Sequence, residues 1–549
     1  MKRLVAALFV AVPLHAQQPG VTLLPDSVVA RIDRAFSSLG GASAPGCGIG
    51  LSQDGKTVLT RAYGLSNLEY GVPNTPETVW ESGSVAKQFT AASVLLLEQD
   101  GKLSLDDDIR KYLPEVPDFG KRITIRNLLT HTSGLRDQWG LLGLKGMGPG
   151  SQVHSLATIV DLVAHQKALN FDPGAEYLYS NTGFALAAVI VKRVSGRSLA
   201  EFSTERLFKP LGMTDTQWRD DYQRVVKGRA TAYDRDARGF VTDMPFTNVY
   251  GNGGLLFTLA DALKWNAFLD DPSAIPGGAK LVKALETPMI FNNGKASTYA
   301  LGLGVATRDG IREVTHSGST AGYRTWLARY PDRKVSVAVF CNTGSANPTG
   351  FGNIATNMLL GRVPRPPQPG AEAVTLSAGE LEKYAGIFRS PSTQLVVRTA
   401  VKDGSLVTTS PTSLALVSTG ADRFRVPGQG EIVYHFANGK PVSVIMVNND
   451  TTRFDIMSVA TPTAMQLKAY VGSYWSDELE ARVTVEVRDS ALVVKQRPDV
   501  EIAMRPTFLD GFVGTDVGNF VFTRNARGAV TGFGLWAGRV RNVRFTRER

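Results

Sequence analysis

A proline-rich segment divides this chain into two parts with different patterns of secondary structure. Residues 362–370 read Arg-Val-Pro-Arg-Pro-Pro-Gln-Pro-Gly, a composition typical of an extended, semi-rigid linker. Before this segment, long apolar helical stretches alternate with strand-like runs. After it, helical signals almost vanish and short alternating runs such as Leu395–Arg398 and Val442–Val447 take over. The 549 residues therefore predict a large mixed unit of helices and strands followed by strand-only units.

The strand-rich tail repeats itself with a fixed offset of 86 residues. The two copies of the motif are Leu381-x-x-Tyr384-x-Gly386-x-Phe388 and Leu467-x-x-Tyr470-x-Gly472-x-Tyr474. A fixed period of short strands indicates two copies of one small domain. About 85 residues of antiparallel meander suit an eight-stranded barrel. We therefore predict a linker over 363–375, barrel 1 over 376–461 and barrel 2 over 462–549.

In the large N-terminal unit, a serine and a lysine stand one turn apart at the start of an apolar helix. The stretch from Gln88 to Asp100 is apolar on nearly every face and is followed by Gly101, as in a buried helix with a glycine stop. Ser84 and Lys87 then share a face of the first turn. Burial lowers the pKa of a lysine, which can then take the proton of a serine hydroxyl. The alternative is an ordinary helix-start serine and a solvated lysine.

A tyrosine and an asparagine precede a second apolar helix. Tyr179 and Asn181 lie on the connector into the stretch from Gly183 to Val194, where side chains can point into a cleft. A phenol beside a lysine ammonium can be held as phenolate and would then act as the base on Ser84. Asn181 can donate to a substrate carbonyl and accept from Lys87. The alternative is a turn tyrosine followed by a helix-capping residue.

Residues 310–330 predict a strand, a glycine-rich corner and a second strand. His316, Gly318 and Ser319 fall at the end of the first strand. A strand edge beside the serine supplies a backbone N–H to an oxyanion and can pair with an extended substrate. We expect His316 to face the cleft as a hydrogen-bond donor. The alternative is a histidine in a β-turn.

Taken together, these motifs resemble the penicillin-binding-protein and class C β-lactamase superfamily, including its esterase and D-aminopeptidase members. The family pattern is Ser-x-x-Lys, then Tyr-x-Asn, then Lys-Thr-Gly or His-x-Gly, and the resemblance covers about residues 28–360 of a catalytic domain assigned to 21–362. It implies an α+β β-lactamase/transpeptidase-like domain, an antiparallel sheet flanked by helices. The tail resembles the two lipocalin-like barrels of the D-stereospecific aminopeptidases, in which a barrel loop approaches the active site and limits substrate size.

The resemblance also implies a role for each residue. Ser84 would be the acylated nucleophile, Lys87 and Tyr179 would share the proton transfers, and the backbone N–H groups of Ser84 and Ser319 would stabilise the oxyanion. No metal and no organic cofactor is required. The expected site residues are Ser84, Lys87 and Tyr179 for catalysis, and Asn181, His316, Gly318 and Ser319 for substrate and oxyanion binding.

These roles predict an exported serine hydrolase that acts through an acyl-enzyme on an ester or a small peptide, including peptides that contain a D-amino acid. One alternative is a β-lactamase or D,D-carboxypeptidase. Against it, those enzymes usually have lysine where this chain has His316. An alternative from another class is a non-catalytic binding protein that keeps the pocket without turnover.

The first 16 residues predict a secretory signal peptide, and hence a periplasmic or secreted protein. Lys2 and Arg3 precede an apolar run that ends before Ala16. The alternative is an uncleaved anchor, although the run is short for a bilayer span, and no other stretch is long and apolar enough. The net charge of +10 is spread without a basic stripe that carries aromatics, which argues against a nucleic-acid partner. The oligomeric state stays open.

Four further residues or segments of the N-terminal unit carry expectations. For His131, in a Thr-His-Thr-Ser-Gly turn, we expect a structural hydrogen bond and not a catalytic role. The glycine-dense segment Trp139–Gly150, with its exposed-looking leucines, predicts a rim or lid of the cleft, or else a flexible surface loop. Cys47 and Cys341 lie in strands that are neighbours in the resembling fold, so a disulfide can form; we favour two separate buried thiols.

Overall fold

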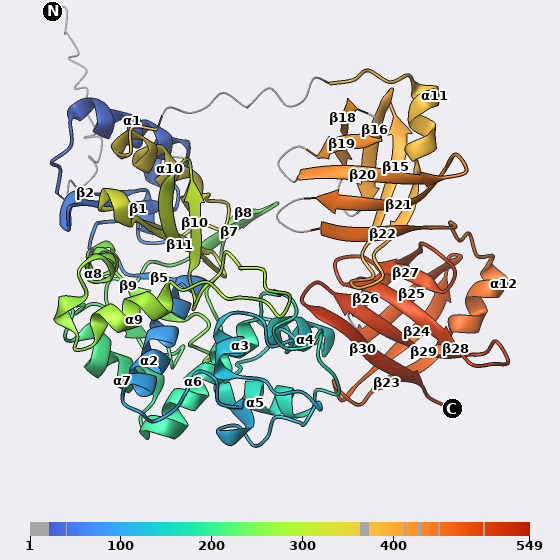
Figure 1. Cartoon of the computed structure of the whole chain (residues 1–549), viewed down its shortest axis with the longest axis horizontal. Helices are drawn as coiled ribbons and strands as arrows, with labels where there is room; N and C mark the ends of the chain where they lie inside the picture. The colour runs from blue at the N-terminus through green and yellow to red at the C-terminus, as the bar shows by residue number, and fades with distance from the viewer. Residues whose placement is uncertain are drawn as a thin grey trace, which may run out of the picture.

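The computed structural model describes residues 21–39, 41–362, 373–410, 413–420, 422–426, 430–447, 451–497 and 500–549. The chain forms one large N-terminal unit and two strand-rich units (Figure 1). The predicted signal peptide and most of the predicted linker lie outside the described residues. Within the described part of the chain, no helix has both the length and the apolar character needed to cross a membrane.

A six-stranded antiparallel sheet forms the centre of the N-terminal unit. Its middle strands are buried along almost their whole length, as expected for a sheet covered on both faces. The strands, in spatial order, are β10 (Gly304–Arg308), β11 (Ile311–Thr320), β12 (Tyr323–Tyr330), β13 (Val335–Cys341), β1 (Cys47–Gln53) and β2 (Lys56–Tyr63).

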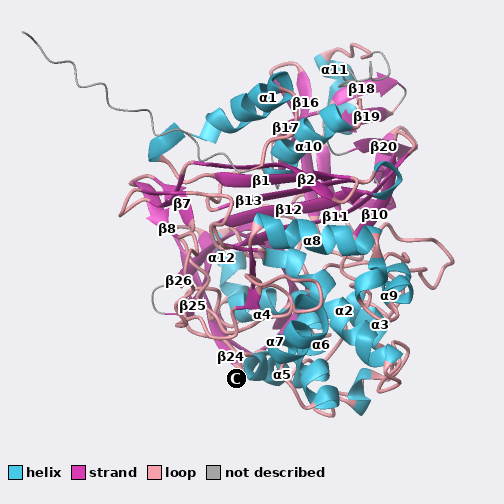
Figure 2. Cartoon of the chain, turned by 90° about the vertical axis from the view of Figure 1, so that its left-hand side faces the viewer, coloured by secondary structure: helices cyan, strands magenta, loops and turns pink. Residues whose placement is uncertain are grey.

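Helices cover both faces of this sheet (Figure 2). On one face lie α1 (Asp26–Phe36) and α10 (Pro348–Leu359). On the other lies α8 (Leu259–Asp270), which packs with α2 (Lys87–Gln99) and α6 (Asn181–Ser195). The smaller helices on this second side are α3 (Ile125–Leu129), α4 (Gln138–Leu144), α5 (Leu156–Ala164), α7 (Leu199–Ser203) and α9 (Gly278–Leu285). The predicted α+β class is confirmed.

Barrel 2 is a closed antiparallel barrel of eight strands. Aromatic and aliphatic side chains fill its interior and leave a cavity of about 10 Å³, too small for a ligand. The strands are β23 (Gly472–Ser476), β24 (Ala481–Arg488), β25 (Ala491–Arg497), β26 (Val500–Pro506), β27 (Gly511–Gly514), β28 (Gly518–Arg524), β29 (Val530–Ala537) and β30 (Val540–Arg547).

Barrel 1 differs from the predicted eight-stranded barrel because one strand is broken. The segment that corresponds to β26 is split at Leu416, whose side chain is buried and whose N–H donates to the carbonyl of Leu406. The two pieces are joined through Leu416 and lie at the two ends of the strand order, so the nine described strands form a nearly closed barrel. In spatial order they are β17 (Leu414–Ala415), β16 (Ser405–Ser410), β15 (Val396–Lys402), β14 (Gly386–Arg389), β22 (Thr451–Met457), β21 (Lys440–Val447), β20 (Gly430–Ala437), β19 (Arg423–Val426) and β18 (Val417–Gly420).

The internal repeat is visible at the entrance to each barrel. One-turn helices α11 (Ala378–Leu381) and α12 (Ala464–Leu467) both begin with a capping box, in which the side chains of the residue before the helix and of the third helical residue satisfy each other's backbone N–H groups. The tyrosine of each repeated motif donates its hydroxyl to an aspartate of its own barrel at 2.8 Å. Two copies of one domain therefore share local structure as well as sequence.

The glycine-dense segment forms part of the rim of the cleft, as predicted, because Trp139, Pro149 and Gly150 line the same pocket as Ser84. Its first half is helix α4, and the leucines that look exposed in the sequence, Leu141, Leu142 and Leu144, are buried in a hydrophobic cluster shared with barrel 2. Gly140 allows the close approach, because a Cβ there would lie 2.6 Å from a methyl carbon of Val540. The catalytic unit and barrel 2 thus have one continuous core.

The two cysteines form a disulfide between the neighbouring strands β1 and β13. Cys47 and Cys341 are directly opposite residues of the antiparallel pair, and their Sγ atoms are bonded. The preference for two separate thiols was wrong, because only strand register decides whether two buried cysteines face each other.

Candidate active site

Ser84 lies in a one-turn 3-10 helix, η3 (Gly83–Ala86), that leads directly into α2. Lys87 is the first residue of α2 and is fully buried. Its Nζ lies 3.0 Å from Ser84 Oγ, 2.9 Å from Asn181 Oδ1 and 2.6 Å from the carbonyl oxygen of Asn252. The oxygens of Asn181 and Asn252 can only accept, so they take the two hydrogens of a neutral amine and leave its lone pair facing the candidate nucleophile.

The environment of Lys87 favours the neutral amine. Burial lowers its pKa well below the ordinary value, Asp137 opposes this with its negative charge, and Arg539 lowers the pKa further. A neutral amine has a lone pair for the proton of Ser84, which a lysine ammonium lacks.

Asn181 is oriented by an aspartate that the sequence did not single out. Asp137 Oδ2 accepts from the Asn181 backbone N–H at 2.7 Å and from Nδ2 at 3.0 Å. These bonds turn Oδ1 of Asn181 toward Lys87, and they leave the second hydrogen of Nδ2 for a substrate carbonyl. Asp137 also caps α4, because Oδ1 accepts from the N–H groups of Trp139 and Gly140.

Tyr179 lies over Lys87 and against Ser84. Lys87 Nζ is 4.8 Å from the ring centroid, and the phenol hydrogen-bonds Ser84. Burial raises the pKa of Tyr179 above its ordinary range, and the bond with Ser84 lowers it only in part. The raised pKa favours the protonated phenol over the phenolate base that the sequence predicted.

A chain of hydrogen bonds runs from the backbone before α6 to His316. The N–H of Ser180 donates to His131 Nδ1, so His131 carries its proton on Nε2 and gives it to the Tyr299 hydroxyl at 3.1 Å. The Tyr299 hydroxyl then donates to His316 Nε2 at 2.9 Å, and His316 Nδ1 donates to the carbonyl of Ser317 at 2.6 Å. Each tautomer follows from the backbone group at its end of the chain.

The two histidines of this hydrogen-bond chain, His131 and His316, are both held neutral. Burial lowers the pKa of His316 to about 3, with a smaller contribution from Lys87. Burial also lowers the pKa of His131 well below its ordinary value. His316 lines the pocket as predicted, but both its ring nitrogens are bonded within the protein, so the expected free donor is absent. The structural role expected for His131 fits its bonds to Ser180 and Tyr299.

Glycines let strand β11 approach the serine. Gly83 has a φ of +50°, and a Cβ there would lie 2.6 Å from the backbone N of Ser319. At Gly318 a Cβ would lie 2.0 Å from the carbonyl oxygen of Ser82 and 2.2 Å from Thr325 Oγ1. The backbone N–H of Ser319 is thereby brought beside the residue that precedes Ser84.

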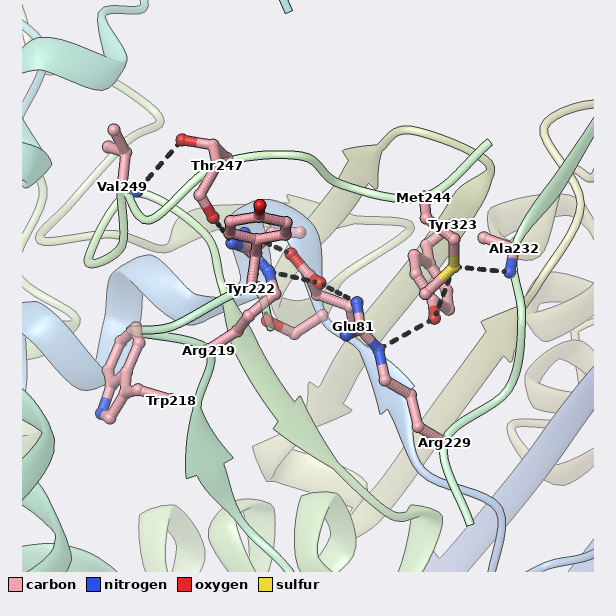
Figure 3. Close-up of polar contacts among 12 residues, drawn as sticks. Glu81, Trp218, Arg219, Tyr222, Arg229, Ala232, Met244, Thr247, Val249 and Tyr323 are labelled. Carbon is pink, nitrogen blue, oxygen red and sulfur yellow. Dashed lines mark hydrogen bonds and ion pairs between the residues drawn. The ribbon is translucent and has the colours of Figure 1, made fainter. Parts of the chain in front are cut away.

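These residues open into a pocket of about 790 Å³. Its far wall is the segment 243–249, held by a buried ion cluster (Figure 3). The Glu81 carboxylate accepts from Arg219 at 3.0 Å and from Arg229 at 2.9 Å, and Arg219 also donates to the Thr247 carbonyl. On the same wall, Met244 Sδ accepts from a backbone N–H at 3.1 Å. The cluster fixes the wall and gives Arg219, the guanidinium that borders the pocket, an anionic partner.

Barrel 2 contributes one side chain to the pocket. Arg539, in the turn between β29 and β30, stacks on Tyr179 with its guanidinium carbon 4.6 Å from the ring centroid. Its carbonyl accepts from Asn170 Nδ2 at 2.9 Å and from the N–H of Asp137 at 3.4 Å. A barrel loop at the active site is what the sequence resemblance implied.

The sequence comparisons place this arrangement in a family. The family model described as Beta-lactamase matches residues 32–361. The chain belongs to the Beta-lactamase family. It is 29% identical over 521 residues to a D-aminopeptidase of Brucella anthropi, and the aligned region covers 90% of this chain and 94% of that protein. It is 25% identical over 464 residues to a D-aminopeptidase of Cereibacter sphaeroides, which covers 83% and 85%.

A solved structure shares the architecture of this Beta-lactamase family member. The octameric penicillin-binding protein homologue from Pyrococcus abyssi superposes with a TM-score of 0.57 at 25% identity, over 78% of this chain and 99% of that one. Together with the family match and the curated relatives, this confirms the expected resemblance and the expectation of a serine hydrolase.

The structure brings together the predicted Ser84, Lys87, Tyr179, Asn181 and His316, and it adds residues that sequence reasoning missed. Asp137, Tyr299 and Arg539 belong to no motif, and each comes from a segment whose position depends on tertiary packing. A capping aspartate before α4 was the only local signal for any of them. The described residues contain no group of three or more His, Cys, Asp or Glu that would hold a metal.

Proposed function

We propose that this protein hydrolyses amide or ester bonds of small substrates that carry a D-amino acid, through an acyl-enzyme on Ser84. The observation that carries the proposal is the fully buried Lys87, whose Nζ lies 3.0 Å from Ser84 Oγ. The preference for D-amino acids is supported by the curated relatives described as D-aminopeptidases. It also agrees with the neutral His316, which brings no cation to the place where β-lactamases usually have lysine.

In the proposed mechanism, neutral Lys87 removes the proton of Ser84 as Oγ attacks the carbonyl carbon. The N–H groups of Ser84 and Ser319 stabilise the oxyanion, an effect typically worth about 3 kcal/mol per donor. Tyr179 gives its proton to the leaving group and recovers one from the Lys87 ammonium. In deacylation a water molecule attacks the acyl ester on Ser84 and loses its proton to Lys87 or Tyr179. The same pair then returns a proton to Ser84 Oγ as the acid product leaves.

The test is intact mass of the wild type and of Ser84→Ala after exposure to p-nitrophenyl acetate, with parallel hydrolysis of D- and L-alanine p-nitroanilide and of a penicillin. We expect an acetyl adduct and D-selective turnover that both need Ser84, while the surface variant Ser273→Ala behaves as wild type. No adduct and no turnover in the wild type would refute the hydrolase proposal in favour of a binding protein. A stable penicillin adduct with no D-alanine turnover would favour the penicillin-binding alternative.

We also propose export to an oxidising compartment. The support is the disulfide between Cys47 and Cys341, which such compartments preserve. Cell fractionation and the N-terminal mass of the mature protein would show it, and a reduced protein with an intact N-terminus in the cytosol would contradict it. Assembly into oligomers is suggested by the octameric homologue and is tested by light scattering on the purified chain.

A further inference from the structure

One cation at the pocket, Arg539, has no hydrogen-bond acceptor for its side chain among the residues that the structure describes. Among the described residues, the Arg539 guanidinium forms no hydrogen bond, and its nearest carboxylate oxygen, on Asp137, is 3.9 Å away. That oxygen already accepts from the backbone and side chain of Asn181. The Arg539 side chain is 47% exposed, and it borders the pocket. Its planar set of N–H donors is therefore available to a ligand.

The other arginines of the pocket wall are already engaged. Arg219 is paired with the buried Glu81 and bonded to a backbone carbonyl. Arg324 donates Nη1 to the carbonyls of Ala321 and Tyr323 at 2.6 and 2.8 Å, and its charge acts on Asp243. Arg539 differs from both because its ion pair with Asp137 is long, at 3.9 Å, and includes no hydrogen bond.

The backbone holds Arg539 firmly at the pocket edge. In addition to the two bonds accepted by its carbonyl, Arg541 N donates to Asn170 Oδ1 at 2.8 Å and the Arg541 side chain pairs with Glu176 at 2.9 Å. Val540 between them is fully buried. These contacts fix the backbone, and the stacking on Tyr179 restricts the side chain, so less entropy is lost when the guanidinium binds a planar anion in a two-bond geometry.

We propose that Arg539 of barrel 2 binds a carboxylate of the substrate, so that the enzyme selects anionic D-amino-acid substrates over neutral or cationic ones. This inference rests on the proposed function and specifies its substrate class. The guanidinium lies against Tyr179 and the Asp137–Asn181 pair, within reach of groups on either side of the bond to be cleaved. Barrel 2 is then part of the specificity site and not a spacer.

The experiment compares kcat/KM of matched substrates at the pH optimum of each variant. The substrates are the p-nitroanilides of N-succinyl-D-alanine, N-acetyl-D-alanine and D-alanine, which are anionic, neutral and cationic on the acyl side. D-Ala-D-Ala and its C-terminal amide test a carboxylate on the leaving side. The variants are Arg539→Gln, Arg539→Glu and the control Arg527→Gln, which removes the same charge from an exposed turn of barrel 2.

We expect Arg539→Gln to lower kcat/KM for a carboxylate substrate by about 10- to 100-fold, mainly through KM, because one charge-assisted contact is lost. The loss for the neutral substrate should be smaller than for the carboxylate substrate, Arg539→Glu should favour the cationic substrate, and the control should match wild type. Added salt should weaken the wild-type preference, since the site is partly exposed.

Two results would overturn the inference while the proposed function stands. One is wild-type turnover of D-substrates without preference for a carboxylate on either side. The other is an equal loss for all substrates in Arg539→Gln, which would assign the residue a structural role. If the wild type hydrolyses none of the substrates, the proposed function itself fails and the inference falls with it.

Discussion

At the scale of single residues, the charge state of Lys87 decides what the site can do. Burial, Asp137 and Arg539 act on its pKa in opposing directions, and burial is the largest effect. The protonated form of Tyr179 and the neutral form of Lys87 are favoured for the same reason, since burial disfavours the charged form of each side chain. The two side chains therefore enter the reaction as a base and an acid and not as an ion pair.

The pH dependence of the reaction should report this lysine. Because burial lowers the pKa of Lys87 and the neutral amine is the active form, kcat/KM should be full above that pKa and fall as the pH drops through it. Lys87→Arg keeps a charged group at every working pH, so we expect a loss of roughly 10²- to 10⁴-fold with no acid limb. The measurement is the pH profile of both proteins, with the exposed Lys111→Arg as control. An unchanged acid limb in Lys87→Arg would assign the titration to another group.

Tyr299 is the link between two neutral histidines, and its removal should cost stability. Tyr299→Phe leaves His131 without an acceptor for its Nε2–H and His316 without a donor to Nε2. We expect a decrease of about 1–3 kcal/mol in the free energy of unfolding, together with a lower kcat/KM as His316 loses its fixed position. Chemical denaturation measures the stability, and steady-state kinetics measure kcat/KM. The control is Tyr70→Phe, because Tyr70 is 84% exposed. Unchanged stability would mean that the hydrogen bonds from His131 through Tyr299 to His316 do not form.

At the scale of elements, the site depends on how closely a strand can approach a helix start. Strand β11 lies beside η3 only because Gly83 and Gly318 have no side chains. The serine comes from a helix turn and the proposed second oxyanion donor from a strand end, so their relative position is set by packing between these two elements.

Gly83→Ala should therefore remove activity while the fold persists. A Cβ at this position would push the Ser319 N–H away, and the loss of one oxyanion donor typically costs roughly 10²- to 10³-fold in kcat. The control is Gly310→Ala, which has a similarly positive φ of +73° but no atom within 4 Å of the added carbon. Kinetics and thermal unfolding of both variants separate backbone strain from displacement of the strand. Wild-type kcat in Gly83→Ala would exclude Ser319 as an oxyanion donor.

At the scale of the whole molecule, barrel 2 and the catalytic unit form one body. They share a hydrophobic cluster, and Arg136 crosses between them. Its side chain pairs with Glu478 at 3.1 Å and donates to the carbonyls of Ala168 and Arg541. The exposed fractions of the two paired side chains are 1% and 5%, so the pair is shielded from water.

Breaking this pair should destabilise the protein strongly. Arg136→Met leaves the Glu478 carboxylate buried without its partner, for which we expect a loss of about 3–5 kcal/mol. Arg482→Met removes an ion pair with Glu548 whose side chains are 60% and 31% exposed, and there we expect at most about 1 kcal/mol. Denaturation curves of both variants make the comparison. Equal small losses would show that the contact between barrel 2 and the catalytic unit contributes little.

The helix that carries the site and the repeat of the tail could both be predicted from the sequence, because each follows from a pattern of nearby or regularly repeated residues. Ser84 and Lys87 are one turn apart whatever surrounds them, the apolar stretch that follows predicts a buried helix, and the 86-residue offset gives two related barrels. These features follow from helix geometry and from repetition, which are written in adjacent residues. The same information left the charge states of Lys87 and Tyr179 undecided, because a pKa depends on burial and neighbours.

Which distant groups meet depends on the tertiary structure. It paired Cys47 with Cys341 through strand register, split one strand of barrel 1 at Leu416, and buried the leucines of α4 against barrel 2. It also placed Asp137 and Arg539 beside Lys87 from segments that share no motif with it. Such contacts depend on how completed elements dock, since docking is governed by the fit of whole surfaces and not by any local pattern of residues.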